Sequence, residues 1–240
     1  MLGLIDKFIE YSKDKYNFEL IPTNVEQTMS ENDLIKIIKN YEGWIIGDDP
    51  ATEEVFKEGK RGNLRAAVKW GVGIDNVNIN AAKDLEIKVK NTPGMFGDEV
   101  ADLALCYLIC LSRKVIEIHS GVMQGKWPKY IGTSLRGSTV GLVGYGDIGK
   151  CLSKRLLASE MNVQIYDPFI NELNFEDSRL TKEIWPNNIK NCNFVILTCS
   201  LNKSNYHMLN KEIFSNLRDG VKIINVSRGP LIDEEELAKQ

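Results

Sequence analysis

The chain has 240 residues, of which 43% are hydrophobic and 26% are charged, and its formal net charge is −3. These values are typical of an ordinary globular protein and exclude a disordered tail, a collagen-like fibre and a small disulfide scaffold. The near balance of charge does not favour a nucleic-acid partner, and neither a membrane-spanning stretch nor a secretory signal is recognisable, so we expect a cytoplasmic protein.

Helix and strand patterns alternate in the first part of the chain. Leu4, Ile5, Phe8 and Ile9 recur at helical spacing, so the chain should open in an amphipathic helix. The further predictions, in chain order, are a strand at 18–21, a helix capped by Ser30, a buried strand at 43–47, a helix at 51–57, a strand at 64–69, a helix at 78–84 and a strand at 87–89. This alternation predicts a mostly parallel sheet covered on both faces.

A second series of elements follows the turn Asn91–Gly94. We predict a long helix from Gly97 to about Ile118 and a loop from 121 to 137. After them come a strand at 139–143, a helix at 148–159 and strands at 163–166, 194–198 and 222–226. We therefore place a domain boundary near residue 91, with one domain at 1–90 and another at 91–240.

The metal-ligating residue types are sparse. The chain has five cysteines and two histidines, and no two cysteines form a Cys-x-x-Cys pair. Cys106 and Cys110 lie four apart in an apolar helical stretch, where packed thiols are more common than metal ligands. We expect no metal site and a reducing environment.

The most specific local motif is Gly144-x-Gly146-x-x-Gly149, which follows an apolar strand and opens a helix. Gly144 would permit the tight turn, Gly146 the approach of a pyrophosphate to the backbone, and Gly149 close packing of helix on strand. The free N–H groups at the start of the helix would bind the phosphates. The motif in this context predicts a dinucleotide-binding domain.

Two aspartates modify this prediction. Asp167 ends the next strand at the spacing of the acidic residue that binds the adenosine ribose, and its charge would repel a 2′-phosphate, so the sequence favours NAD over NADP. Asp147 lies inside the loop, where its side chain should point outward to solvent to keep its charge from the pyrophosphate.

A different motif, Ser227-Arg228-Gly229-Pro230, follows directly after the last predicted strand. In an open parallel sheet, ligands bind outside the carboxyl ends of the strands. A guanidinium at such an end can hold a carboxylate by two parallel hydrogen bonds. A surface arginine at a turn is the alternative, and spacing alone does not decide between the two.

Together these segments resemble the family of D-isomer-specific 2-hydroxyacid dehydrogenases. The resemblance rests on five ordered segments, which are Lys69–Asn76, Asn91–Gly94 with the long helix, Thr139–Gly149, Val163–Pro168, and Asn191 through Glu234. It implies an α/β fold with a flavodoxin-like substrate domain and a Rossmann domain, both incomplete here. It also implies NAD-dependent hydride transfer between a D-2-hydroxy acid and a 2-oxo acid.

The resemblance implies a role for each matched position. Arg228 would be the catalytic arginine that binds the substrate. The backbone of Gly71, Val72 and Gly73 would hold the substrate carboxylate. The residues implied at the cofactor are Gly144, Gly146, Asp147, Ile148 and Gly149 at the pyrophosphate, Asp167 at the ribose, and Cys199 and Val226 beside the nicotinamide. Relatives commonly form homodimers through segments like Ala101–Trp127, so a homodimer is expected.

The chain also departs from the family pattern. The family's acid/base histidine and the glutamate that orients it lie C-terminal to the arginine motif, and this chain stops at Gln240. His119 and His207 match neither of them. The opening strand of the family has no counterpart either, so we expect a fragment of a longer protein. The alternative function is a non-catalytic NAD(H)-binding module, like the corepressors that share this fold. A weaker alternative is another two-domain NAD enzyme, such as an alanine dehydrogenase.

Overall fold

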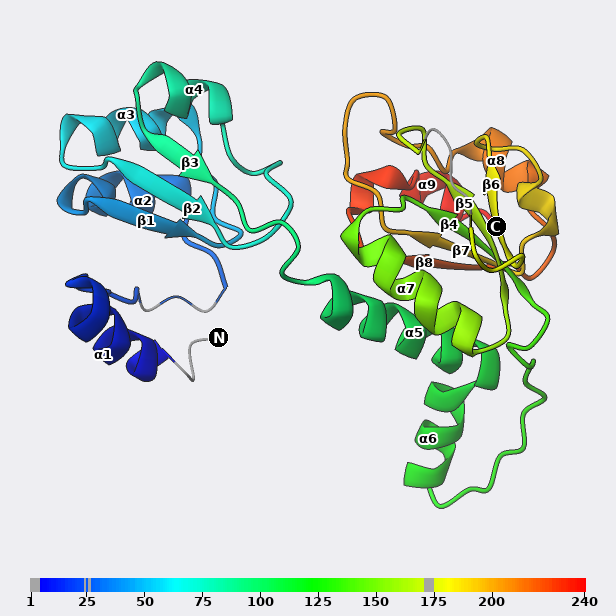
Figure 1. Ribbon diagram of the computed structural model, residues 1–240. Coiled ribbons are helices and arrows are strands. Elements are labelled where there is room, and N and C mark those ends of the chain that lie inside the picture. The colour runs from blue at the N-terminus through cyan, green and yellow to red at the C-terminus, as the bar shows by residue number, and fades with distance from the viewer. Residues whose placement is uncertain (1–4, 24, 26, 171–174) are drawn as a thin grey trace. The chain divides into compact units, whose positions relative to one another are not determined.

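Two separate parallel sheets organise the chain in the computed structural model, which describes residues 5–23, 25, 27–170 and 175–240 (Figure 1). The chain divides into two compact units. The first consists of Met1–Trp70 and Ile74–Asn91, and the second of Gly71–Gly73 and Thr92–Gln240. The α/β class and the parallel sheets predicted above are confirmed.

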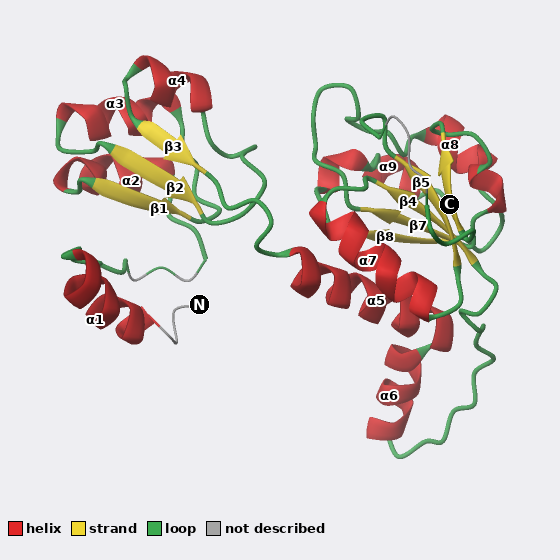
Figure 2. Ribbon diagram, in the orientation of Figure 1, coloured by secondary structure: helices red, strands yellow, loops and turns green. Residues whose placement is uncertain are grey.

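The first unit contains three parallel strands in the order β1-β2-β3, connected by helices (Figure 2). Its elements are α1 (Ile5–Tyr16), α2 (Glu31–Ile37), β1 (Gly43–Ile46), α3 (Glu53–Arg61), β2 (Ala66–Lys69), α4 (Ile79–Asp84) and β3 (Lys88–Lys90). Three of the helices begin at a side-chain cap, because Ser30, Thr52 and Asn78 each accept a hydrogen bond from the backbone N–H three residues later.

Among the described residues of the first unit, helices cover only one face of the sheet. Ile46 and Ala67 are buried against α2 and α3, whereas Ile45 and Val68 on the opposite face are 53% and 42% exposed. The expectation of two covered faces and of a fully buried strand at 43–47 is therefore wrong. Side chains alternate between the faces of a strand, and in this unit only one face has helices packed on it.

The predicted strand at 18–21 is also wrong. These residues form no strand, and the side chains of Phe18 and Ile21 are 64% and 54% exposed. An extended segment becomes a strand only when a neighbour takes up its backbone hydrogen bonds, and β1 pairs with β2 alone. The opening helix is confirmed as α1, although Leu4 lies outside the described residues.

The second unit contains five parallel strands in the order β6-β5-β4-β7-β8. Its elements are α5 (Gly97–Arg113), α6 (Val115–Met123), β4 (Thr139–Val143), α7 (Asp147–Ala158), β5 (Asn162–Tyr166), β6 (Leu180–Glu183), β7 (Phe194–Leu197), α8 (Lys211–Asn216), β8 (Lys222–Asn225) and α9 (Glu234–Leu237). The chain starts in the central strand β4, moves outward to β6, and returns to the other side of β4 as β7. This reversal makes the carboxyl ends of β4 and β7 the topological switch point, where ligands bind in such sheets.

Both faces of the second sheet are covered. Val140 and Leu142 point to the side of α5 and α7, where they pack with Leu108 and Leu156. The alternate residues, with Val143 as an example, pack on the side of α8. The sequence analysis did not predict β6, α8 or α9, and it placed the other strands of this unit within one residue at each end.

The long helix predicted from Gly97 to Ile118 is interrupted at Lys114, which adopts a left-handed conformation with φ 56°. The N–H of Thr133 donates to the carbonyl of Ser112 at 2.9 Å, so this carbonyl is held by a loop. The second part, α6, extends to Met123 and includes the start of the loop predicted at 121–137. No helix in the described part of the chain has both the length and the apolar composition that crossing a bilayer requires.

Candidate cofactor and substrate site

The glycine loop lies at the switch point, between the ends of β4 and β7. Gly144 has φ +95°, and a Cβ placed on it would lie 2.7 Å from the backbone N and Cα of Cys199. The hydroxyl of Thr198 donates to the carbonyl of Gly144 at 2.8 Å and holds the two strand ends together. Only glycine fits at residue 144, because both its conformation and its neighbours exclude a side chain.

The other two glycines of the motif differ in their surroundings. A Cβ on Gly149 would collide with the carbonyl oxygen of Gly144, so the start of α7 packs directly on the turn. A Cβ on Gly146, the N-cap of α7, would meet nothing within 4 Å. The first backbone N–H groups of α7, which include those of Asp147 and Ile148, have no acceptor within the helix. This open approach to free donors fits the pyrophosphate of a dinucleotide.

The side chain of Asp147 is turned toward another helix. The residue is exposed, but its carboxylate does not point only to solvent as expected, because a Cβ on Gly97 would lie 2.5 Å from its Oδ2. Gly97 is the first residue of α5, whose N-terminus attracts negative charge. The carboxylate of Asp147 therefore lies against the start of α5, whereas its backbone N–H belongs to the first turn of α7.

Asp167 connects the end of β5 to the glycine loop. Its Oδ2 accepts a hydrogen bond from the N–H of Tyr145 at 2.7 Å, and its Oδ1 accepts one from the N–H of Phe169 at 2.9 Å. The residue is half-buried. A carboxylate has about four lone-pair positions, so two backbone bonds leave room for ribose hydroxyls.

Cys199 and Val226 follow β7, which pairs with β4, and β8, which pairs with β7. Burial raises the pKa of the Cys199 thiol to about 11, so the thiol is neutral at physiological pH. The hydroxyl of Ser227 donates to the carbonyl of Cys199 and joins the two strand ends. The N–H of Val226 donates to the carbonyl of Leu197 at 3.3 Å. Cys199 and Val226 thus provide a half-buried, uncharged wall at the strand ends.

Arg228 begins the turn after β8 and is half-buried. Asn225 holds this turn with both ends of its amide. Its Nδ2 donates to the carbonyl of Arg228 at 2.8 Å, and its Oδ1 accepts from the N–H of Ser227 at 2.9 Å. One guanidinium nitrogen of Arg228, Nη1, donates to the carbonyl of Ser227 at 3.0 Å. The sequence analysis did not single out Asn225, although its place three residues before the arginine suits such a side-chain-to-backbone bond.

The segment Gly71-Val72-Gly73 is attached to Thr92 and belongs to the second unit. The N–H of Gly71 donates to Oγ1 of Thr92 at 3.0 Å, and the N–H of Thr92 donates to the carbonyl of Gly71 at 3.1 Å. Gly71 has φ +146°. Thr92 is a second site-related residue that sequence reasoning missed, because its partner lies 21 residues away.

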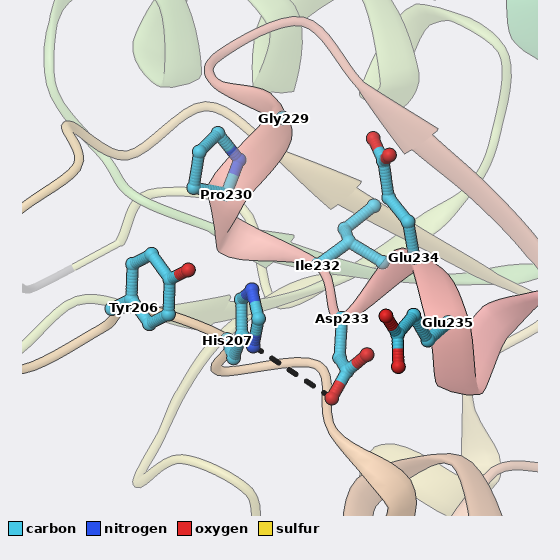
Figure 3. Close-up of a pocket in the computed structure, with 8 residues that line it drawn as sticks. All are labelled: Tyr206, His207, Gly229, Pro230, Ile232, Asp233, Glu234 and Glu235. Carbon is cyan, nitrogen blue, oxygen red and sulfur yellow. Dashed lines mark ion pairs between the residues drawn. The ribbon is translucent and has the colours of Figure 1, made fainter.

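A cavity of about 540 Å³ lies beside the Arg228 turn (Figure 3). It is lined by Tyr206, His207, Gly229, Pro230, Ile232, Asp233, Glu234 and Glu235. The imidazole of His207 faces Asp233 within this cavity, with Nδ1 3.7 Å from Oδ2. The other histidine, His119, is exposed on α6.

The structure thus collects most of the expected cofactor residues at one edge of the second sheet. Gly144, Gly149 and Cys199 are in direct contact, and Asp167 reaches the same loop through Tyr145. Arg228 follows the neighbouring strand. Backbone donors, a carboxylate and a guanidinium at the ends of adjacent strands can together hold a dinucleotide and an anionic acid.

Comparison with known proteins finds relatives that cover most of the chain. Residues 105–240 match the sequence profile described as the NAD binding domain of D-isomer specific 2-hydroxyacid dehydrogenases, which agrees with the expected cofactor. A hydroxypyruvate reductase from Thermotoga maritima is 33% identical over 215 residues, which are 88% of this chain and 69% of the reductase. A D-3-phosphoglycerate dehydrogenase from Archaeoglobus fulgidus is 31% identical over 220 residues, which are 90% of this chain and 41% of that protein.

A solved structure extends the comparison to the fold. The NAD⁺-bound 3-phosphoglycerate dehydrogenase of Entamoeba histolytica has a TM-score of 0.81 and 28% identity, and the match covers 98% of this chain and 70% of that one. This chain therefore spans between about two fifths and three quarters of the length of the relatives and solved structures that it matches.

Proposed function

Because the chain belongs to the family of D-isomer-specific 2-hydroxyacid dehydrogenases, we propose that it serves an NAD-dependent oxidoreductase that interconverts a D-2-hydroxy acid and a 2-oxo acid. One observation carries the proposal. The glycine loop, the carboxylate of Asp167 and the guanidinium of Arg228 all lie at the carboxyl ends of strands in one sheet. Ligands of open parallel sheets bind at this edge.

In this proposal the chain's own residues hold the cofactor. The first N–H groups of α7 bind the pyrophosphate, with Gly146 leaving space for its approach. Asp167 accepts hydrogen bonds from the ribose hydroxyls and repels a 2′-phosphate, which selects NAD over NADP. Cys199 and Val226 border the nicotinamide with uncharged groups. NAD, when bound, supplies the acceptor or donor of the hydride.

Arg228 is assigned to the substrate. Its planar guanidinium can bind the carboxylate and the adjacent oxygen of a 2-oxo acid through parallel hydrogen bonds. The backbone of the segment Gly71–Gly73 would contact the same carboxylate, with Gly71 held in place by the bond from its N–H to Thr92. We assign the transfer of the hydroxyl proton to a histidine, oriented by a glutamate, from a segment C-terminal to the arginine motif, because neither His119 nor His207 matches the family's acid/base position.

We also propose that the partner in assembly is a second copy of the chain. None of the residues of α6 is buried, and the apolar side chains on this helix and the loop after it are widely exposed. Examples are Met123 at 75%, Trp127 at 80% and Ile131 at 96%. A nine-residue helix with no fully buried residue is marginal in water, and large exposed apolar side chains on one segment favour an interface.

The proposed function is tested by binding and by turnover. We expect the chain to enhance NADH fluorescence on titration, and a chain extended beyond residue 240 through the family's histidine segment to oxidise NADH with at least one of pyruvate, glyoxylate, hydroxypyruvate and 3-phosphohydroxypyruvate. NADH binding without turnover by the extended chain would favour the non-catalytic sensor. No NADH binding by either chain would contradict both functions.

A further inference from the structure

The turn that carries Arg228 is supported on its far side by one short segment, residues 207–209. The N–H of His207 donates to the carbonyl of Pro230 at 2.8 Å, and the N–H of Leu209 donates to the carbonyl of Leu231 at 3.1 Å. The N–H of Asp233 donates back to the carbonyl of Leu209 at 2.9 Å. The backbone that follows Arg228 is therefore bound along its length to this segment.

The side chain of His207 adds a polar contact to the same support. Its Nδ1 lies 3.7 Å from Oδ2 of Asp233, and the ring of Tyr206 stacks on the imidazole with 4.0 Å between centroids (Figure 3). The second oxygen of Asp233, Oδ1, accepts a hydrogen bond from the N–H of Glu236 at 3.1 Å and caps α9. Asp233 thus faces the imidazole and caps the first turn of the helix that follows.

The backbone of His207 is itself in an unusual conformation. Its φ is +51°, in the left-handed region, which few residues other than glycine occupy and in which histidine, asparagine and aspartate are the most common of the others. Residues held in such regions cluster at sites that the surrounding structure holds in place. Here both the N–H and the imidazole of His207 are used in contacts with the segment after Arg228.

We propose that His207, through Pro230 and Asp233, is a positioning residue for Arg228. The inference rests on the proposed function, in which Arg228 binds the substrate carboxylate. Asn225 anchors the turn before the arginine and His207 anchors it after the arginine. A two-pronged guanidinium–carboxylate contact depends on placement within about 0.5 Å, so loss of one anchor weakens substrate binding without removing any group that touches the substrate.

Three variants separate the side chain of His207 from its backbone conformation. His207→Gly keeps access to φ +51° and loses the imidazole. His207→Asn also tolerates this conformation and retains a side-chain donor for Asp233. Asp233→Asn keeps the cap of α9, since asparagine is an equally good N-cap, and removes the charge that faces the imidazole.

Two readouts test the proposal on the whole chain. The first is amide hydrogen exchange in the peptide 228–233, which needs no ligand. The second is the affinity for oxalate, a small mimic of a 2-oxo acid, at saturating NADH. We expect His207→Gly to accelerate exchange and to weaken oxalate binding about threefold to tenfold, the range for one lost polar contact, while NADH affinity stays unchanged. His207→Asn should restore both toward the parent values, and Asp233→Asn should act in the same direction as His207→Gly.

The proposal is overturned if His207→Gly leaves exchange and oxalate affinity unchanged, or if it weakens NADH and oxalate equally, which would show a general loss of structure. Failure of the proposed function would give a different experimental result. In that case the parent chain binds no oxalate, and the exchange comparison alone decides whether His207 holds the turn.

Discussion

The carboxylate of Asp167 and the backbone N–H of Tyr145 are joined by a 2.7 Å hydrogen bond across 22 residues of sequence. Tyr145 lies between the first two glycines of the motif, so this bond attaches the glycine loop to the end of β5. The same carboxylate is therefore both a structural part of the loop and the proposed ribose ligand. Because one carboxylate has both roles, replacing it should affect both the glycine loop and the binding of the cofactor.

Replacement of Asp167 by asparagine should weaken NADH binding about tenfold, because hydrogen bonds to a charged acceptor contribute roughly 1.5–3 kcal/mol. It should also narrow the preference for NADH over NADPH, since the repulsion of the 2′-phosphate is removed. Fluorescence titration with both nucleotides measures this. Asp219→Asn, an exposed position in the turn before β8, is the control, and equal effects of the two variants would contradict the assignment.

Gly144 and Gly146 should respond differently to alanine. Gly144→Ala introduces a Cβ against the backbone of Cys199 at φ +95°, so we expect a loss of about 2 kcal/mol or more in the free energy of unfolding. Gly146 has φ −74° and open space around it. Gly146→Ala should therefore leave the melting temperature nearly unchanged and reduce NADH affinity, because the new methyl group occupies the path of the pyrophosphate. A stable Gly146→Ala variant with normal NADH affinity would contradict the placement of the pyrophosphate.

Arg228→Lys should keep the charge and lose the planar fork of donors. We expect oxalate affinity at saturating NADH to fall about tenfold or more, since a bidentate charged contact is replaced by a point charge, while NADH affinity is unchanged. Isothermal titration calorimetry checks both. Arg218→Lys, at an exposed position, is the matched control and should have no effect on either ligand.

The buried thiols predict a loss of stability at alkaline pH. Burial raises the pKa of both Cys192 and Cys199 from 9.0 to about 11. Above pH 9 the unfolded chain releases these protons while the folded chain retains them, so the unfolded state is favoured as pH rises from about 9 to 11. The free energy of unfolding, measured with urea, should be constant near pH 8 and fall above pH 9.

The matched variant for this prediction is Cys192→Ala, which removes a fully buried thiol. It should lower stability at pH 8, because a small cavity is left, and it should flatten the decline above pH 9. A decline as steep as that of the parent chain would assign the alkaline transition to other groups.

The exposed apolar face predicts the oligomeric state. Ile131→Asp places a charge at a position that is 96% exposed in one copy, so it should not affect the fold of that copy. We expect the parent chain to be a dimer by light scattering at micromolar concentration and the variant to be a monomer. Lys129→Ser, two residues away, is the control. A monomeric parent chain would contradict the proposed homodimer.

Local patterns were sufficient for many elements of the fold. The cap Ser30, the apolar strand at 139–143 and the glycine loop with its helix were all recognisable in the sequence. Each depends on contacts within a few residues or on the conformational freedom of glycine, which amino-acid type specifies directly. The family resemblance, carried by the same motifs, then extended this information to the expected cofactor and to Arg228.

Long-range contacts determined the remaining features. Residues 18–21 have the composition of a strand but no paired neighbour, whereas Leu180–Glu183 is mostly polar and becomes β6 by pairing with β5. The long helix ends at Lys114, next to a carbonyl that Thr133 holds from a distant loop. The hydrogen bonds from Tyr145 to Asp167 and from Gly71 to Thr92, and the contact between the side chains of His207 and Asp233, join residues about 20 or more positions apart. Such contacts depend on which segments the folded chain brings together, and the spacing of residues along the sequence does not encode them.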